Sequence, residues 1–295
     1  MSNLSESLKH NKFVITAEVA PRKGTIISNF IKTVNALKGH ADAINITDNQ
    51  RAIMRMSSLV ASYLVLKEGI EPIFQLTCRD RNRLAIQSDL LGAGMLGIKN
   101  VLALTGDHPS AGDFPDAKPV FDLDATTLLY TISRFNEGFD LNDQPLNGRT
   151  EFFQGAALTP QLNPSAPVLS SIERKINAGA RFFQTQPVFN VEMFAGFMEK
   201  INRFNVPVIA GVLLLHSAEQ ADKLNKQVPG INIPDRLIKR LESSANPIEE
   251  GINLSVELAV NLQRIAHGVH IMTVGQEKAL PIIVKRIYDE VHPSL

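Results

Sequence analysis

Short apolar runs recur along the whole chain, each introduced by a glycine and closed by a polar residue. Gly97, for example, precedes IKNVLALT and Asp107. The glycines of this kind are Gly39, Gly69, Gly97, Gly179 and Gly268. A glycine just beyond a helix can take the left-handed conformation that caps the last carbonyls. The apolar runs are then buried parallel strands, and the pattern predicts a chain of alternating helices and strands.

The spacing of the apolar runs predicts the fold class. We expect strands to begin near Val14, Ala43, Pro72, Val101, Phe153, Phe182, Pro207 and Gly268. Eight strands in 295 residues fit a closed (β/α)8 TIM barrel, with residues 1–295 as a single domain. A doubly wound open sheet is the alternative, but it usually has fewer strands and a glycine-rich turn after the first one. The first strand here runs into AEVAPRKG, which is no such turn.

Two intervals between strands are much longer than the others, after the fourth and the seventh strand. The first contains a Pro-, Gly- and Asp-rich stretch and then a predicted helix from Ala125 to Asn136. The second is typical of several amphipathic helices, with Pro234 and Pro247 in first turns. Long insertions in a barrel are often binding loops. Ordinary packing against the barrel wall explains them equally well.

Composition narrows the class of protein. The chain is 44% hydrophobic with no net charge, which gives no general attraction to nucleic acid or acidic membranes. It begins without the apolar core of a signal peptide, and no run is long enough to span a membrane. Cys78 is the only cysteine, so the chain alone can form neither a disulfide nor an iron–sulfur cluster. The histidines lack metal-ligand spacing. We therefore expect a cytoplasmic protein without a protein-held metal.

In a (β/α)8 barrel the active site forms at the carboxyl ends of the strands. Glu18 lies near the end of the first predicted strand, FVITAEVAP, and alternation places it on the same face as Thr16. A carboxyl among apolar neighbours could hold a proton near neutral pH and act as a general acid. A structural ion pair with a basic neighbour such as Arg22 is the alternative.

Other strand ends carry groups suited to a flat ligand. Asp107 follows Gly106, and a glycine lets such a ligand approach the backbone closely. The Gly-Asp pair could equally be a simple turn. Gln186 offers an amide with both donors and an acceptor, which suits the edge of a heterocycle or a neighbouring strand end.

The helix after the fifth strand is expected to begin at SSIERK, where Ser170 and Glu173 have the spacing of a capping box. Arg174 and Lys175 would then lie close to the helix start, where a bound anion is stabilised by free amides and by both charges. Solvated surface charges are the alternative interpretation.

Taken in order, several segments resemble the methylenetetrahydrofolate reductases, flavin enzymes that make 5-methyltetrahydrofolate. They are ITAEVAP, INIT, QLTCRDRNR, NVLALTGDHP, KPVFDLD, INAGARFFQTQPVF and GVLLLHSAEQADKL. The resemblance runs from about Phe13 to Glu290 and implies a (β/α)8 barrel. It also implies that Glu18 is the general acid that protonates N10 and that Asp107 lies beside flavin and folate. Gln186 and Gln220 match folate-contacting glutamines.

The resemblance further implies a flavin site lined by Thr47, Thr105, Gly106, Asp107, Asp122, Asn163, Arg174 and Lys175. Four positions in the cofactor and substrate sites depart from the well-known NADH-using members. Thr105 replaces an arginine, Gln75 a histidine and Thr159 a tyrosine. Leu224 replaces a phenylalanine that stacks on the nicotinamide or folate. The changes at Thr105 and Leu224 disfavour direct use of a nicotinamide.

The segments LTGDH and VFDLD are most similar to the branch of the family found in acetogenic bacteria. The resemblance thus implies FAD, or alternatively FMN, with tetrahydrofolate as substrate. Electrons would come from NAD(P)H or from an electron-delivering partner subunit, and the protein would be an oligomer. Two other functions stay open: a pterin-binding methyltransferase barrel without flavin, and a flavin-bearing subunit whose catalysis resides elsewhere.

Overall fold

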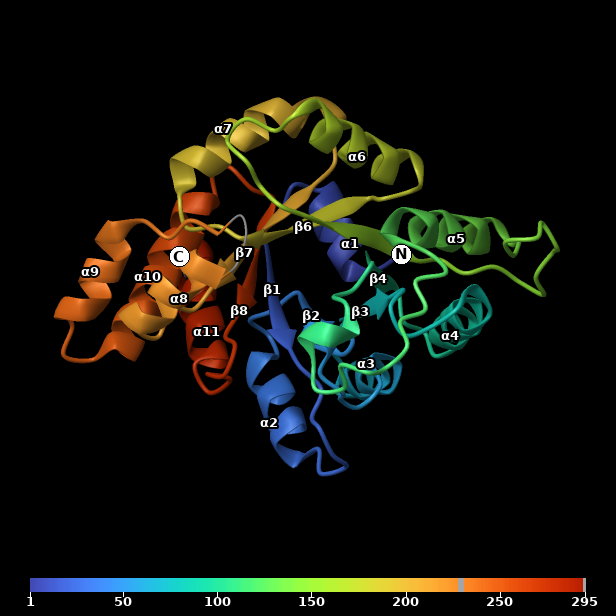
Figure 1. The fold of residues 1–295 in the computed structure, drawn as a ribbon, viewed down its shortest axis with the longest axis horizontal. Coiled ribbons are helices and arrows are strands. Elements are labelled where there is room, and N and C mark those ends of the chain that lie inside the picture. Colours follow the sequence, from blue (N-terminus) through green and yellow to red (C-terminus); the bar gives the residue numbers. More distant parts are fainter. Residues whose placement is uncertain (228–230, 294–295) are drawn as a thin grey trace.

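A computed structural model describes residues 1–227 and 231–293. Its strands are all parallel and form a closed barrel in sequential order, with β8 paired to β1 (Figure 1). They are β1 (Val14–Val19), β2 (Ala43–Ile46), β3 (Pro72–Thr77), β4 (Asn100–Leu104), β5 (Phe153–Leu158), β6 (Phe182–Pro187), β7 (Val208–Leu213) and β8 (Gly268–Met272). The predicted (β/α)8 barrel is confirmed. β4 begins one residue earlier than expected and β7 one residue later.

Helices surround this barrel (Figure 1). They are α1 (Asn3–Lys9), α2 (Ser28–Leu37), α3 (Ser58–Lys67), α4 (Arg83–Met95), α5 (Ala125–Glu137), α6 (Ala166–Asn177), α7 (Val191–Ile201), α8 (Ala218–Gln227), α9 (Asp235–Ser243), α10 (Pro247–Leu262) and α11 (Leu280–Val291). Short 3₁₀ turns are η1 (Gln50–Ala52), η2 (Pro109–Ala111) and η3 (Asn202–Phe204). Among the described helices, none is long and apolar enough to cross a membrane.

The glycines before the strands explain where four of the helices stop, namely α2, α3, α4 and α6. Gly39, Gly69, Gly97 and Gly179 have φ values of 82°, 81°, 86° and 110°, the left-handed conformation expected after a helix. Gly268 is different, because it is the first residue of β8 and is not left-handed. A Cβ at Gly268 would lie 2.4 Å from the carbonyl oxygen of Val14. A glycine is needed there for close packing of β8 on β1.

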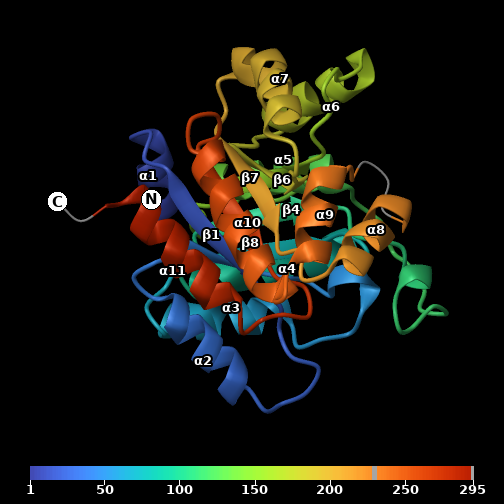
Figure 2. The ribbon, with the colours of Figure 1, turned by 90° about the vertical axis from the view of Figure 1, so that its left-hand side faces the viewer.

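One end of the barrel is closed by an apolar floor. Leu4 and Leu8 of α1 pack against inward-facing side chains of the strands, and the rings of Phe153 and Phe182 stack with centroids 5.0 Å apart. The other members of this floor are Val14, Ala43, Ile73, Leu102 and Ile209. Figure 2 shows α1 on one side of the barrel and both α8 and the loop after β4 on the other. The carboxyl ends of the strands therefore lie at the end of the barrel opposite this floor.

The two long insertions are as expected after β4 and β7, and α5 begins at Ala125 as predicted. Pro247 is the first residue of α10, whereas Pro234 caps α9 from one position before its start. The predicted start of α6 at Ser170 is wrong. This helix begins at Ala166, because Pro167 suits the first turn of a helix.

Candidate active site at the barrel mouth

Glu18 points into the barrel near the carboxyl end of β1, with 11% of its side chain exposed. Gln50 Nε2 donates a hydrogen bond to Glu18 Oε1 at 2.9 Å. His270 Nε2 on β8 lies 3.7 Å from Glu18 Oε2. The partner of this carboxyl is therefore a histidine, and the alternative ion pair with Arg22 is not formed.

A buried polar layer extends from His270 across the barrel, above the apolar floor. Thr16 Oγ1 lies 3.0 Å from His270 Nδ1 and 3.3 Å from the carbonyl oxygen of Val269. Because the threonine hydroxyl can donate to that carbonyl, its oxygen can accept from Nδ1–H of His270, which leaves Nε2 with a lone pair facing Glu18. The side-chain amides of Asn45 and Gln184 complete the layer. Asn45 Nδ2 donates a hydrogen bond to Gln184 Oε1 at 2.6 Å, and Gln184 Nε2 donates one to Asn45 Oδ1 at 3.1 Å.

Sequence reasoning missed His270 and Gln50. The signal for His270 was the alternation in GVHIM, which places it on the same face as Gly268 and Met272. Nothing in the sequence near Gln50 indicated that its side chain points toward Glu18, because this orientation depends on the unusual backbone of η1.

The loop after β4 brings Asp107 to the mouth of the barrel. Gly106 is left-handed with φ +92°, and a Cβ there would lie 3.1 Å from the Cβ atoms of Thr77 and Arg79. The chain therefore passes tightly against β3, and the exposed Asp107 side chain follows directly. The predicted cofactor residue Thr105 uses its Oγ1 to accept from Ala125 N at 3.2 Å, at the start of α5.

Arg79 lies next to the loop after β4. Its side chain is 2% exposed and forms two 2.7 Å bonds with Asp80. Its Nη1 also lies 3.4 Å from the carbonyl oxygen of Asp107. Since a buried guanidinium with two fixed bonds has little freedom, it supports the position of the Asp107 backbone.

Thr47 and Gln75 are both buried, at the ends of β2 and β3. Among the described residues, Thr47 Oγ1 has no hydrogen-bond partner. A buried hydroxyl without a partner is costly unless a ligand or water satisfies it. The adjacent Asp48 is already satisfied, since it accepts from Thr77 N at 2.9 Å and from Arg81 at 2.8 Å. Thr47 is therefore the hydroxyl available to a ligand.

The remaining predicted cofactor residues differ in what they can do. Asp122 accepts three bonds of 2.8 to 2.9 Å from Arg83, and these lower the pKa of Asp122 to about 2. The Asp122 carboxylate is therefore already bonded within the protein, to Arg83. Thr159 and Asn163 are exposed.

Arg174 and Lys175 lie in the last turn of α6, so the predicted anion site at the start of this helix is wrong. Arg174 is exposed. The long side chain of Lys175 nevertheless reaches the carboxyl half of β5, where Nζ donates to Ala157 O at 2.8 Å. Burial lowers the pKa of the Lys175 ammonium, with Asp124 acting in the opposite direction. A half-buried ammonium of this kind is suited to an anion.

The predicted folate residues lie on the β6 and α8 side. Gln186 is exposed at the end of β6. Gln220 and Leu224 are one turn apart on α8. Gln220 Oε1 accepts from His216 N at 2.8 Å, which leaves its amide N–H groups for a ligand. Leu224 packs against the buried apolar cluster that includes Leu213.

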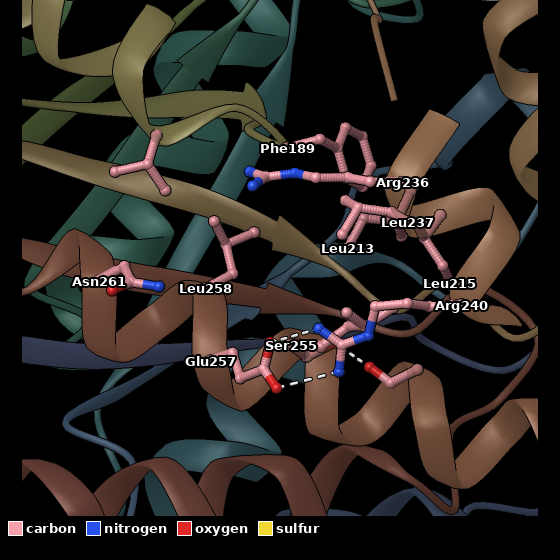
Figure 3. A pocket seen from close by; sticks show the side chains of 13 residues that line it. Phe189, Leu213, Leu215, Arg236, Leu237, Arg240, Ser255, Glu257, Leu258 and Asn261 are labelled. Carbon is pink, nitrogen blue, oxygen red and sulfur yellow. Dashed lines mark hydrogen bonds and ion pairs between the residues drawn. The ribbon is translucent and has the colours of Figure 1, made fainter. Parts of the chain in front are cut away.

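A separate groove of about 160 Å³ lies between β7 and helices α9 and α10 (Figure 3). Its wall is mainly apolar and includes Leu213, Leu215 and Leu237, while Arg240 is paired with Glu257 at 2.7 Å. None of the predicted site residues lines this groove. This groove is therefore separate from the residues that the sequence predicts for the site.

The fold and this site define a (β/α)8-barrel protein with a buried carboxyl–histidine pair beneath a polar mouth. A family model described as methylenetetrahydrofolate reductase matches residues 3–288, so the chain belongs to the methylenetetrahydrofolate reductase family.

Individual relatives are distant. Methylenetetrahydrofolate reductase 2 of Schizosaccharomyces pombe is 27% identical over 256 residues, covering 78% of this chain and 38% of that protein. The 5,10-methylenetetrahydrofolate reductase of Salmonella typhimurium is 25% identical over 208 residues, covering 67% of this chain and 63% of that protein. The chain thus spans less than two thirds of the length of these curated relatives.

A solved structure from Clostridium thermocellum shares the fold, with a TM-score of 0.66 at 20% identity. It covers 97% of this chain and 99% of its own. That protein is described as binding two copies of 5-methyl-5,6,7,8-tetrahydrofolic acid.

Proposed function

We propose that this protein catalyses the flavin-dependent reduction of 5,10-methylenetetrahydrofolate to 5-methyltetrahydrofolate. The observation that carries the proposal is the partly buried carboxyl of Glu18, held beside His270 at the carboxyl end of β1 in a chain of this family. The folate bound by the Clostridium thermocellum neighbour supports the substrate class.

The residues at the mouth fit a flavin. Thr47 offers a buried hydroxyl with no partner among the described residues, and Gly106 brings backbone close to the same region. Lys175 offers an ammonium with a lowered pKa, which a phosphate would stabilise. Thr47, Gln75, Thr105 and Gly106 would hold the ring, and Lys175 the phosphate of FAD or of FMN. The bound flavin would supply the hydride.

Glu18 supplies the proton that opens the five-membered ring of the substrate. Gln50 occupies Oε1, so Oε2 is the oxygen that can carry a proton. The lone pair of His270 Nε2 can take up a proton from solvent and pass it to Oε2, 3.7 Å away, after a small movement of either side chain. A positioned general acid typically contributes about 10² to 10⁴ in rate.

Asp107 places a negative charge at the mouth, where the ring-opened substrate is a cationic iminium. A carboxylate that faced the bound folate here would stabilise that cation. Gln186 and the free amide N–H groups of Gln220 would hold the folate heterocycle. Orientation of folate against the cofactor would then supply much of the acceleration.

We further propose that the electron donor is not NADH acting alone. Leu224 lacks the aromatic ring that stacks on a nicotinamide, and Thr105 lacks the charge of an arginine. The similarity to the acetogen-type branch favours a partner subunit or a low-potential carrier, in a cytoplasmic oligomer. Stopped-flow mixing of the purified oxidised protein with NADH tests this, because rapid bleaching of its flavin would contradict the partner requirement.

The function is tested by the absorption spectrum of the purified protein, the mass of the cofactor that it releases, and turnover with a reduced artificial donor. We expect a yellow protein that forms 5-methyltetrahydrofolate. A colourless protein that binds folate would instead indicate a pterin-binding methyltransferase barrel. A yellow protein without turnover would indicate a flavin-bearing subunit of a larger complex.

A further inference from the structure

The turn after β2 has an unusual backbone. Asn49, Arg51 and Ala52 have φ values of 45°, 58° and 55°, the left-handed region that residues other than glycine rarely adopt. Three such residues among four consecutive positions form a costly conformation. Strain of this kind persists only where the surrounding structure enforces it, and it is concentrated at functional sites.

Neighbouring loops hold this turn. Within it, Arg55 N donates to Asn49 Oδ1 at 2.9 Å, and Asn49 Nδ2 reaches Asp80 Oδ2 at 3.3 Å. The loop after β4 lies directly on it, since a Cβ at Gly112 would come within 1.8 Å of the carbonyl oxygen of Ala52.

Asp113, which follows Gly112, stabilises the same contact between the loop after β4 and the turn. Asp113 accepts from Met54 N at 2.9 Å and pairs with Lys23 from the loop after β1. Three neighbouring loops, those after β1, β3 and β4, thus hold the turn in place.

The turn places the side chain of Gln50 against the carboxyl of Glu18. Gln50, between the left-handed residues, donates from Nε2 to Glu18 Oε1 at 2.9 Å. We propose that Gln50 is the positioning residue for Glu18, and that the strained turn exists to present its amide to one carboxylate oxygen. This inference rests on the proposed acid role of Glu18 for its catalytic meaning, but the contact itself can be tested without substrate.

An amide donor has two effects on the carboxyl. It fixes the side chain so that Oε2 is the oxygen left for the proton, and it favours the charged form, because it bonds to a carboxylate more strongly than to a neutral acid. Among the described residues, His270 on β8 is the basic group within 4.0 Å of Glu18, and Asn45 on β2 is its neutral neighbour in the sheet. Gln50 cannot titrate, so its effect is constant with pH.

The test compares Gln50→Ala and Gln50→Met with the parent protein. Methionine keeps the length of the side chain without its donor, and thermal unfolding confirms that each variant is folded. In protein labelled with ¹³C at the glutamate carboxyl, the signal missing from Glu18→Gln identifies Glu18. We expect its titration midpoint to move about one pH unit upward in both variants, as the loss of a donor to a charged group requires.

Activity gives a second reading. Turnover that needs the protonated acid falls as the pH rises, and in both variants this fall should begin at a higher pH than in the parent protein. The low-pH plateau of turnover should be roughly tenfold lower, because the carboxyl is no longer held in position. Gln263→Ala, an exposed glutamine that follows α10, is the control and should change neither measurement.

The two proposals fail in different ways. If a folded Gln50→Met protein keeps the parent midpoint, the positioning role of Gln50 is overturned whatever the enzyme does. If the midpoint moves and the pH profile of turnover does not, Gln50 is confirmed as the partner of Glu18, and it is the acid role of Glu18 that is contradicted.

Discussion

His270 Nε2 lies 3.7 Å from Glu18 Oε2, across the seam where β8 closes the barrel on β1. The other ring nitrogen of His270 is 3.0 Å from Thr16 Oγ1. The histidine is thus oriented by a threonine on the same strand as the carboxyl that it faces. This places a carboxyl and an imidazole side by side at the base of the mouth.

Glu18→Gln should lower folate reduction by about 10² to 10⁴, because an amide cannot deliver the proton. The bound flavin and its reduction by an artificial donor should be nearly unchanged, which serves as the internal control. Steady-state and single-turnover assays on the same preparation separate the two. Turnover close to that of the parent protein would remove Glu18 from the acid role.

His270→Ala should reduce turnover by less than Glu18→Gln, roughly 10- to 100-fold, because it removes only the group that returns the proton. The double variant should be little worse than Glu18→Gln alone, since residues acting as a unit are not additive. A double-mutant cycle on turnover measures this coupling. Independent, multiplying effects would show that His270 acts elsewhere.

Asp107→Asn should weaken folate turnover and raise the reduction potential of the bound flavin, because removing a nearby negative charge favours the addition of electrons. A potentiometric titration measures the shift. Asp116→Asn removes an equal charge from an exposed position on the same loop and should shift the potential less. No shift, or a downward one, in Asp107→Asn would mean that this carboxylate does not face the flavin.

Lys175→Met should weaken flavin retention about 10- to 100-fold, the effect of losing a bond to a charged group. The same change should raise the Tm of the cofactor-free protein, because burial of an ammonium is unfavourable and lowers its pKa. Equilibrium dialysis and thermal unfolding measure the two effects. Arg174→Met removes an exposed charge and should change both less. Unchanged flavin affinity in Lys175→Met would return this residue to a structural role.

Asp122→Asn should lower the Tm slightly near pH 7, and this difference should shrink as the pH falls below 4 and become negligible below pH 2. Arg83 lowers the pKa of Asp122 from 3.8 to about 2, so the carboxylate is favoured in the folded state. A lowered pKa stabilises the fold above the ordinary value, and this contribution disappears as the pH falls from about 4 to 2. Tm measured against pH for both proteins tests the sign. A difference that stays constant down to pH 2 would contradict the ion pair.

The repeated local pattern of this chain was enough to predict its architecture. Eight strand positions followed from short apolar runs, and four glycines marked helix ends, because burial of a strand and the left-handed cap of a helix are each decided by a few neighbouring residues. That Glu18 shares a strand face with Thr16 followed from the period of two in a strand. The start of α6 was misjudged, because a capping-box spacing at Ser170 competes with a proline already suited to the first turn at Pro167.

The partners of Glu18 were decided only by the tertiary structure. His270 reaches it because the barrel closes, and the register of β8 on β1 then places the ring beside the carboxyl. Gln50 reaches it because packing from three other loops enforces a left-handed turn that its own residues disfavour. Both contacts depend on free energy contributed by segments distant in the chain, so no local pattern encodes them.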